Sequence, residues 1–265
     1  MTKLKPRHNR FAIFSDVHAN LPALQAVLAD IQKQGIEDCY CLGDLVDFAP
    51  WPNEVIELLK ARNIPVIYGN HDERVAFDKA ISPMPWHSEE EQTARITGIT
   101  ISKATVSAEN MAWLRALPMS LSLNVGSENN PFHLLLVHAS PRSVSEYIYA
   151  DYDAMLLAQM SAQYQFDAMI TGHTHCAYIR KLSGGYHDDF TVANCGAVGR
   201  IKSGQPQATW LRGEVSDGQL KMSIRAVNYN VAAVAQAIVD SNIPDFYAHE
   251  LYHHGLSSLQ ALSGK

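Results

Sequence analysis

The feature that most constrains the fold is an apolar run that ends abruptly in polar residues and recurs at nearly constant spacing. Residues 11–14 lead into Asp16-Val-His18, a second run ends in Asp44, and a third ends in Asn70. Asp44 follows Asp16 by 28 residues and Asn70 follows Asp44 by 26, close to the roughly 30 residues of a strand–helix–strand unit. Helical patterns fill the intervals, so the spacing predicts parallel strands whose carboxyl ends share one edge.

The remainder of the chain predicts further strands and helices in one α/β domain over residues 1–265, with no clear linker. Around 73–119 the βα rhythm stops, and a helical insertion is expected over or beside the site. The predicted strands are 38–42, 64–68, 121–125, 132–137, 166–170, 178–182, 190–194, 208–214 and 220–227, with a turn at 126–131. The predicted helices are 21–31, 53–62, 89–104, 107–117, 151–164, 231–240 and 246–262.

Composition narrows the class of partner. Hydrophobic residues make up 47% of the chain and charged residues 18%, which is ordinary for a soluble globular protein. The net charge is −6 with Lys and Arg scattered, so no stable complex with nucleic acid is expected. No apolar run approaches the roughly 20 residues of a membrane span, and we expect a cytoplasmic protein. Cys39 and Cys41 read as packed core thiols, because none of the four cysteines forms a C-x-x-C pair.

Five apolar strands each end in a polar cluster of metal-ligand type. Singly, each residue has an ordinary interpretation, since Asp and Asn favour turns and caps and a lone His is usually structural. Jointly, strand ends that share one edge would bring the side chains together, and this favours a metal site over independent turns. The seven candidate ligands are Asp16, His18, Asp44, Asn70, His138, His173 and His175.

The donor set indicates which metals fit. Seven groups exceed the three or four protein ligands of one zinc site. Carboxylate, amide oxygen and imidazole without thiolate suit Mn²⁺, Fe or Zn²⁺. Two such ions sharing a carboxylate are the arrangement used for in-line displacement at phosphorus, with one shared hydroxide attacking.

These residues carry a resemblance. Asp16-x-His18, Gly43-Asp44-x-x-Asp47, Gly69-Asn70-His71-Asp72, His138 and Gly172-His173-x-His175 resemble, in order, the motif set of the calcineurin-like metallophosphoesterases. The resemblance implies an α/β fold, a four-layer α/β/β/α sandwich of two mixed sheets flanked by helices. It implies two divalent transition-metal ions, Mn²⁺ first and Fe, Zn²⁺ or Ni²⁺ as alternatives. One ion would bind Asp16, His18, Asp44 and His175, and the other Asp44, Asn70, His138 and His173.

The resemblance also implies catalytic roles for His71 and Asp47. His71 would protonate the leaving oxygen or stabilise the transition state, and Asp47 would orient its ring. The expected function is hydrolysis of phosphodiester or phosphomonoester bonds in a small phosphoester or nucleotide, dinucleoside polyphosphates included. Phe48-Ala49-Pro50 replaces the Arg-Gly of the protein Ser/Thr phosphatases, which argues against a phosphoprotein substrate.

Two residues are candidate substrate contacts. The stretch 194–200 resembles a loop of the compact bacterial branch of the family, in which Arg200 could meet a phosphate or lie solvated on the surface. Asn20 could contact phosphate, but a helix cap is favoured.

Two other functions compete. His249-Glu250-Leu251-Tyr252-His253 matches the zinc-peptidase pattern H-E-x-x-H. It lacks the downstream third ligand, so the polar face of a C-terminal helix is the better interpretation. A non-catalytic metal-binding scaffold on the same fold is the second rival, and the intact ligand set argues against it.

Overall fold

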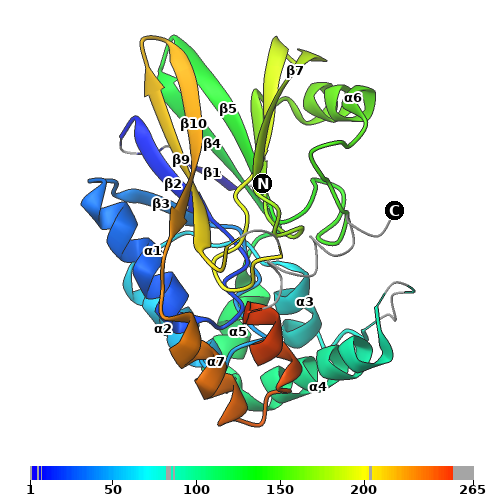
Figure 1. The fold of residues 1–265 in the computed structure, drawn as a ribbon. Coiled ribbons are helices and arrows are strands. Elements are labelled where there is room, and N and C mark those ends of the chain that lie inside the picture. Colours follow the sequence, from blue (N-terminus) through cyan, green and yellow to red (C-terminus); the bar gives the residue numbers. More distant parts are fainter. Residues whose placement is uncertain are drawn as a thin grey trace.

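The computed structural model describes residues 2–4, 6, 8–81, 85, 87–202 and 205–252, and two mixed β-sheets form its centre (Figure 1). The larger sheet has the strand order β1-β4-β5-β6-β8-β7. Its strands are β1 (Thr2–Leu4), β4 (Ser120–Ser127), β5 (Asn130–Val137), β6 (Ala168–Thr171), β8 (Asp188–Asn194) and β7 (Tyr178–Gly185). β5, β6 and β8 run parallel, whereas β4 and β7 pair antiparallel with their neighbours β5 and β8.

The smaller sheet has the order β10-β9-β2-β3. Its strands are β10 (Gln219–Val227), β9 (Ala208–Ser216), β2 (Arg10–Phe14) and β3 (Asp38–Cys41). β2 and β3 are parallel, as the βαβ spacing predicts, and β9 pairs antiparallel with β2.

Alternation along β2 explains why the two sheets pack face to face. Successive side chains of a strand point to opposite faces. Phe11 and Ile13 join the cluster between the sheets, with Leu134 of β5 among its members, and Ala12 and Phe14 join the cluster under the outer helices. Each fully buried Phe or Ile contributes about 1.5–3 kcal/mol, so β2 belongs to both cores.

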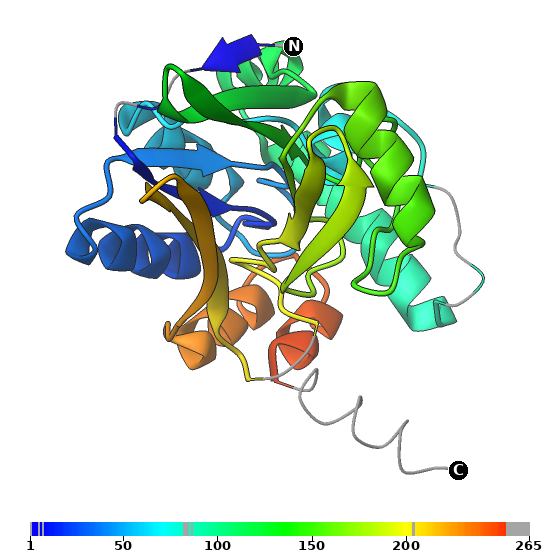
Figure 2. The same cartoon turned by 90° about the horizontal axis from the view of Figure 1, so that it is seen from above.

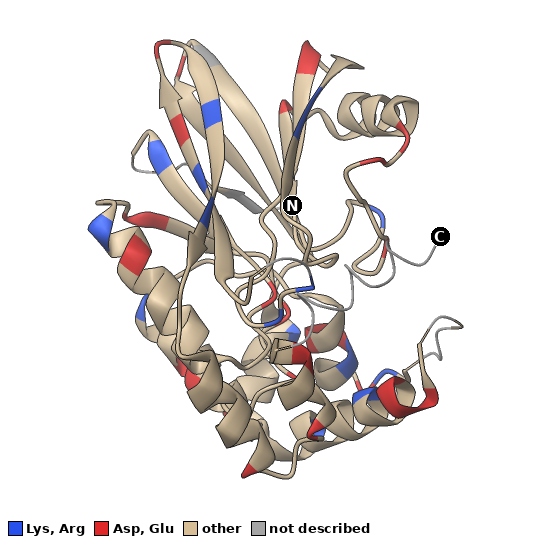
Figure 3. Ribbon diagram, viewed as in Figure 1, with Lys and Arg blue, Asp and Glu red and all other residues tan. Residues whose placement is uncertain are grey.

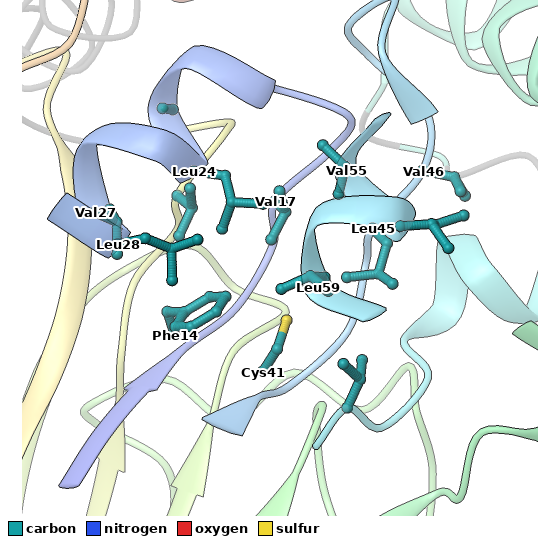
Figure 4. Close-up of a cluster of buried hydrophobic side chains, with 14 of the residues drawn as sticks. Phe14, Val17, Leu24, Val27, Leu28, Cys41, Leu45, Val46, Val55 and Leu59 are labelled. Carbon is teal, nitrogen blue, oxygen red and sulfur yellow. The ribbon is translucent and has the colours of Figure 1, made fainter. Parts of the chain in front are cut away.

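Helices cover the outer faces of both sheets, completing the α/β/β/α sandwich that the motif resemblance implies. α1 (Leu21–Lys33) and α2 (Pro52–Ala61) pack on the smaller sheet, where Phe14 and Cys41 point toward Leu28 and Leu59 (Figure 4). α6 (Ala154–Tyr164) packs on the larger sheet. Viewed from above, α1 and α6 lie on opposite sides of the molecule (Figure 2).

The remaining helices gather beyond the strand ends (Figure 1). They are α3 (Asn70–Ala76), α4 (Glu89–Thr105), α5 (Ala108–Ala116), α7 (Val231–Val239) and a short helix at 246–252. α4 and α5 confirm the helices predicted within the insertion, and Ser88 and Ser107 cap them by accepting from Glu91 N and Asn110 N.

Three predicted elements need correction. Residues 64–68 form only an isolated bridge between Val66 and Cys41, because Pro65 has no N–H and Tyr68 N donates to Pro118 O instead. The turn predicted at 126–131 is shorter, since β4 and β5 stay paired to Ser127 and Asn130. The predicted helix 246–262 is described to residue 252, and the rest lies outside the described residues.

The core thiols behave as predicted. Cys41 is fully buried and Cys39 packs against the same cluster, and burial raises the pKa of Cys39 to about 12. Among the described residues, no helix is long and apolar enough to cross a membrane.

Candidate metal centre

The predicted ligands meet at an edge that both sheets share. Asp16 and His18 follow β2, Asp44 follows β3, His138 follows β5, His173 and His175 follow β6, and Asn70 begins α3. The sequence predicted one edge of parallel strands; the structure corrects this to the joined ends of two sheets. The join is direct, because His173 N donates to Asp16 Oδ2 over 2.9 Å.

The backbone at this edge adopts a conformation that ordinary residues rarely take. Left-handed φ values occur at most of the candidate ligands and at Asp47, and each costs on the order of 1 kcal/mol or more. Such strain is retained where the surrounding structure needs a particular side-chain direction, so it marks this edge as a functional site. The φ values are 55° at Asp16, 48° at His18, 51° at Asp44, 70° at Asp47, 63° at His173 and 62° at His175.

The first group of ligand atoms surrounds Asp16 Oδ1. His175 Nε2 lies 3.2 Å away and His18 Nε2 3.9 Å, and the two ring nitrogens are 3.3 Å apart. The outer Nδ1 of His175 donates to the carbonyl of Arg200, and that of His18 lies 3.4 Å from the carbonyl of Val46. With Nδ1–H held outward, each ring turns the lone pair of Nε2 toward the carboxylate, as in a metal ligand.

The second group surrounds the Asn70 amide. Its Oδ1 lies 3.0 Å from His138 Nε2 and 2.8 Å from His173 Nδ1. His138 Nδ1 donates to Leu42 O over 2.8 Å, so Nε2 is the ring atom turned toward the amide. Such a convergence is favourable around a cation. Rotated by half a turn, the amide would instead donate to both rings and accept from Arg74, which is the arrangement that suits a cation-free site.

Asp44 connects the two groups. Its Oδ2 lies 3.4 Å from His138 Nε2, 3.8 Å from His18 Nε2 and 4.0 Å from His71 Nε2. Burial alone would raise the pKa of Asp44, but His138 and His71 hold it well below its ordinary value. Burial likewise opposes protonation of His138, yet the Asp44 carboxylate raises its pKa to about 9. A negative charge is therefore built into the middle of the site.

Unpartnered polar atoms test whether a cation fits. Asp16 Oδ1, the atom that the Nε2 atoms of His18 and His175 face, is buried without a hydrogen-bond partner among the described residues. Burial lowers the pKa of His18, His173 and His175, which keeps these rings neutral and their lone pairs available. Buried carboxylates without a counter-charge are costly. The donor set of two carboxylates, an amide oxygen and neutral imidazoles therefore fits divalent cations.

His71 lies at the margin of this centre with Asp47 behind it. His71 Nδ1 donates to Asp47 Oδ2 over 2.8 Å, and Asp47 Oδ1 accepts from Phe48 N over 2.9 Å. His71 N donates to Asp44 Oδ1 over 2.8 Å, so the ring is anchored to the Asp44 carboxylate as well. On the other side of Asp47, a Cβ at Gly98 of α4 would overlap Oδ1.

Asp72 is a supporting residue whose role the sequence analysis missed. Its carboxylate accepts from Leu45 N over 2.8 Å and from Gly69 N over 2.9 Å, tying the Asp44 loop to the start of α3. Burial and the neighbouring Asp44 raise the pKa of Asp72 to about 7. Its place three residues after the N-cap is the signal that could have revealed it, since an acidic N3 residue commonly bonds back to the cap. Gly69 must lack a side chain, because a Cβ there would overlap the Asp44 carboxylate.

The two candidate substrate contacts are otherwise engaged. Asn20 caps α1, with Oδ1 accepting from Ala23 N and Nδ2 donating to Gly199 O, and it is 1% exposed. Arg200 is neither solvated nor free: it is 5% exposed, pairs with Glu250 at 2.7 Å and lies 4.0 Å from the centroid of the Phe48 ring. Both polar ends of Asn20 and the charge of Arg200 are thus satisfied by the protein itself.

The peptidase-like motif finds no centre of its own. The Glu250 carboxylate accepts hydrogen bonds from Arg200, and His253 lies outside the described residues. Within the described part of the chain, the candidate clusters of His, Cys, Asp and Glu for a metal ion draw only on residues of the centre above.

Fold and site together define an α/β/β/α protein with a buried carboxylate–imidazole centre for divalent cations, and comparison with known proteins agrees. The model of the calcineurin-like phosphoesterase superfamily domain matches residues 10–218. The uncharacterized protein MJ0912 of Methanocaldococcus jannaschii is 26% identical over 254 residues, 91% of this chain and 96% of that protein.

Two solved structures share the fold over nearly the whole chain. A metallophosphoesterase from Sphaerobacter thermophilus has a TM-score of 0.72 at 26% identity, covering 94% of this chain and 100% of its own. The hypothetical protein PH1004 from Pyrococcus horikoshii OT3 has a TM-score of 0.74 at 21% identity, covering 93% and 98%. The chain belongs to the calcineurin-like phosphoesterase superfamily. Membership implies a hydrolase that depends on metal, and the structure holds His and Asp groups able to bind it.

Proposed function

We propose that this protein hydrolyses small phosphoesters or nucleotides with a centre of two divalent ions. The observation that carries the proposal is the position of Asp44, whose Oδ2 lies within 4.0 Å of ring nitrogens from His18, His71 and His138. A carboxylate placed between two groups of inward lone pairs is suited to bridging two ions.

The ligand assignment follows the two groups. Asp16, His18 and His175 would hold one ion and Asn70, His138 and His173 the other, with Asp44 shared. The mixture of oxygen and nitrogen donors without thiolate supports Mn²⁺ first, with Fe, Zn²⁺ or Ni²⁺ as alternatives. Bound there, such ions would activate water at neutral pH and neutralise phosphoryl oxygens.

The protein's own part in the reaction is proton transfer and orientation. His71 presents Nε2 beside Asp44 while its Nδ1–H is fixed by Asp47. This geometry leaves Nε2 to donate a proton to the departing oxygen, and the Asp47 carboxylate stabilises the imidazolium that does so. An acid at this position makes poorer leaving groups accessible, so monoesters as well as diesters fall within the proposal.

The test combines metal content, stability and activity. Purified protein should contain up to two transition ions, and loading with Mn²⁺ at about 100 times its Kd should raise the free energy of unfolding by about 2.7 kcal/mol for each site filled. Hydrolysis of bis(p-nitrophenyl) phosphate should stop with chelator and return with Mn²⁺. Metal bound without hydrolysis of any phosphoester would mean the non-catalytic scaffold instead.

A matched pair of variants separates the site from the strand that carries it. His138 and His133 are both histidines of the β5 region, at the strand's carboxyl end and near its start. His133 bonds to Asn124 over 2.9 Å, away from the centre. His138→Ala should lose metal and activity, whereas His133→Ala should keep both; equal behaviour of the two would contradict the proposal.

A further inference from the structure

Arg74 lies one helical turn beyond Asn70 and His71 on α3, against the outer end of the Asn70 amide. Its Nη1 and Nη2 are 2.7 Å and 3.2 Å from the amide atom that faces away from the two rings. When Oδ1 of Asn70 faces His138 and His173, that outer atom is the NH₂ group, which cannot accept a hydrogen bond. The guanidinium then needs another acceptor.

Arg95 of α4 is a second guanidinium whose neighbour is an uncharged group. It is 7% exposed, and its Nη1 lies 2.5 Å from His87 Nδ1. Burial and the charge of Arg95 lower the pKa of His87 to about 4, so this imidazole is neutral and brings no negative charge. Among the described residues, no carboxylate lies within salt-bridge distance of Arg74 or Arg95.

The helices that carry the two guanidinium groups lie on the His71 side of the centre. Arg95 precedes Gly98 by one turn of α4, and Gly98 abuts Asp47, the partner of His71. After burial, the charges of Arg74 and Arg200 are what lower the pKa of Arg95, so these groups are close enough to repel one another. Figure 3 shows a basic segment on each of α3 and α4, the helices beyond the strand ends.

A bound anion would neutralise the charges of the two guanidinium groups. Arg200 in the same region has its counter-charge in Glu250, but neither Arg74 nor Arg95 makes a salt bridge with a carboxylate of the described part of the chain. Buried charges without a partner destabilise a protein, and paired guanidinium groups recognise phosphate through several hydrogen bonds at once. Since His71 is the residue placed to protonate the departing oxygen, an anion held here belongs to the leaving group.

We propose that Arg74 and Arg95 form a subsite for a second phosphate on the leaving group. The substrate class is then a phosphoanhydride such as a nucleoside diphosphate, and this rests on the proposed phosphoesterase function. In the reaction the water oxygen bonds to the attacked phosphorus and the bridging P–O bond breaks. The departing phosphate keeps the bridging oxygen with its electron pair; one water proton stays on the new P–OH and the other reaches the departing oxygen by way of His71.

Binding of a non-hydrolysable probe tests the subsite independently of turnover. Imidodiphosphate and inorganic phosphate are titrated calorimetrically into the Mn²⁺-loaded full-length protein. Wild type should bind imidodiphosphate at least about tenfold more tightly than phosphate, because charge-assisted hydrogen bonds to the second phosphate add to those at the metals. Arg74→Gln and Arg95→Gln should each weaken imidodiphosphate about tenfold and phosphate less than about threefold.

Arg62→Gln is the matched control, since Arg62 is an exposed arginine at the end of α2 and should change neither affinity. Arg74 is only half-buried, so Arg74→Gln keeps the test valid if Arg95→Gln folds poorly. No preference in wild type, or equal weakening of both probes in Arg74→Gln, would overturn the subsite.

Kinetics then separate the subsite from the proposed function. ADP and bis(p-nitrophenyl) phosphate differ in whether the leaving group carries a phosphate. Arg74→Gln should lower kcat/KM about tenfold for ADP and leave the aryl diester nearly unchanged. A wild type that hydrolyses neither but prefers imidodiphosphate would sink the proposed function and keep the subsite, and an equal loss on both substrates would do the reverse.

Discussion

His71 Nδ1 and Asp47 Oδ2 lie 2.8 Å apart, a buried contact that fixes the direction of the ring beside Asp44. An imidazole held this way can serve as a general acid, which is typically worth 10²–10⁴-fold. His71→Ala should therefore reduce turnover of alkyl phosphodiesters by about 100-fold or more. The loss on bis(p-nitrophenyl) phosphate should be much smaller, because p-nitrophenolate leaves without a proton. Steady-state rates on the pair measure this, and equal losses on both would count against an acid role.

Gly98 offers a way to disturb Asp47 from outside the metal centre. A Cβ there would overlap Asp47 Oδ1 and approach the Tyr247 ring. Gly98→Ala should displace the carboxylate and reproduce part of the His71→Ala effect, about tenfold on alkyl diesters. Metal content should stay unchanged. Thr100→Ala on the exposed face of the same helix is the control, and a Gly98→Ala enzyme with normal leaving-group dependence would show that α4 does not position Asp47.

Asp44 is the carboxylate that lies between both ligand groups, so in the proposed two-ion centre its charge should control the binding of each ion. Asp44→Asn keeps the shape and can still accept from His71 N, but it removes the negative charge. We expect metal affinity to fall by more than about 100-fold, since even outer partners of a metal site contribute 10–100-fold. Metal analysis after gel filtration measures this. Two ions retained per chain would exclude Asp44 as the bridge.

The sequence predicted those parts of the site that depend on strand ends. β2, β3, β5 and β6 are short apolar runs, and the residues after them must converge once the strands are adjacent. The strand prediction failed at residues 64–68, because Pro65 has no N–H to donate to a neighbouring strand and Tyr68 N donates to the distant Pro118 O. Strand periodicity alone does not show which carbonyl each backbone N–H will bond to in the folded chain.

Roles that depend on the packing of distant helices could not be predicted. Arg200 looked like a loop residue facing solvent or substrate, but its partner Glu250 is 50 residues away on the helix at 246–252. Arg74 and Arg95 lie on different helices with an irregular stretch between them, and no spacing rule brings them together. Asn20, by contrast, is a local cap and was correctly favoured as one.

Asp30 gives a prediction about pH that does not involve the centre. Its Oδ2 accepts from Arg225 Nε over 3.0 Å and from Trp210 Nε1 over 3.1 Å, joining α1 to β9 and β10. The Arg225 hydrogen bond lowers the pKa of Asp30 below 3.8. A lowered pKa stabilises the fold fully above the unfolded-state value, and that contribution is lost as pH falls through the folded-state value. Asp30→Asn should cost about 1 kcal/mol at pH 7.

Urea unfolding of Asp30→Asn and wild type at pH 7, 5 and 4 measures this difference. The gap should be constant between pH 7 and 5 and begin to narrow as pH falls below 4. A gap that widens toward acid would show that the sign is wrong. Asp240→Asn at the exposed end of α7 is the control and should change stability little at any pH.

Substitution of Glu250 can show whether the helix at 246–252 has a structural role or a peptidase role. Glu250→Ala leaves the Arg200 guanidinium, 5% exposed, without its main carboxylate, and should destabilise the protein by about 3 kcal/mol. Its metal content should not change, and neither should that of His249→Ala. The double variant Arg200→Met with Glu250→Leu should recover much of the loss, because an apolar pair can replace a buried ion pair at little cost. Thermal unfolding and metal analysis distinguish the two roles. Loss of metal in Glu250→Ala or His249→Ala would support a peptidase site. Loss of stability alone assigns Glu250 to holding Arg200 against Phe48.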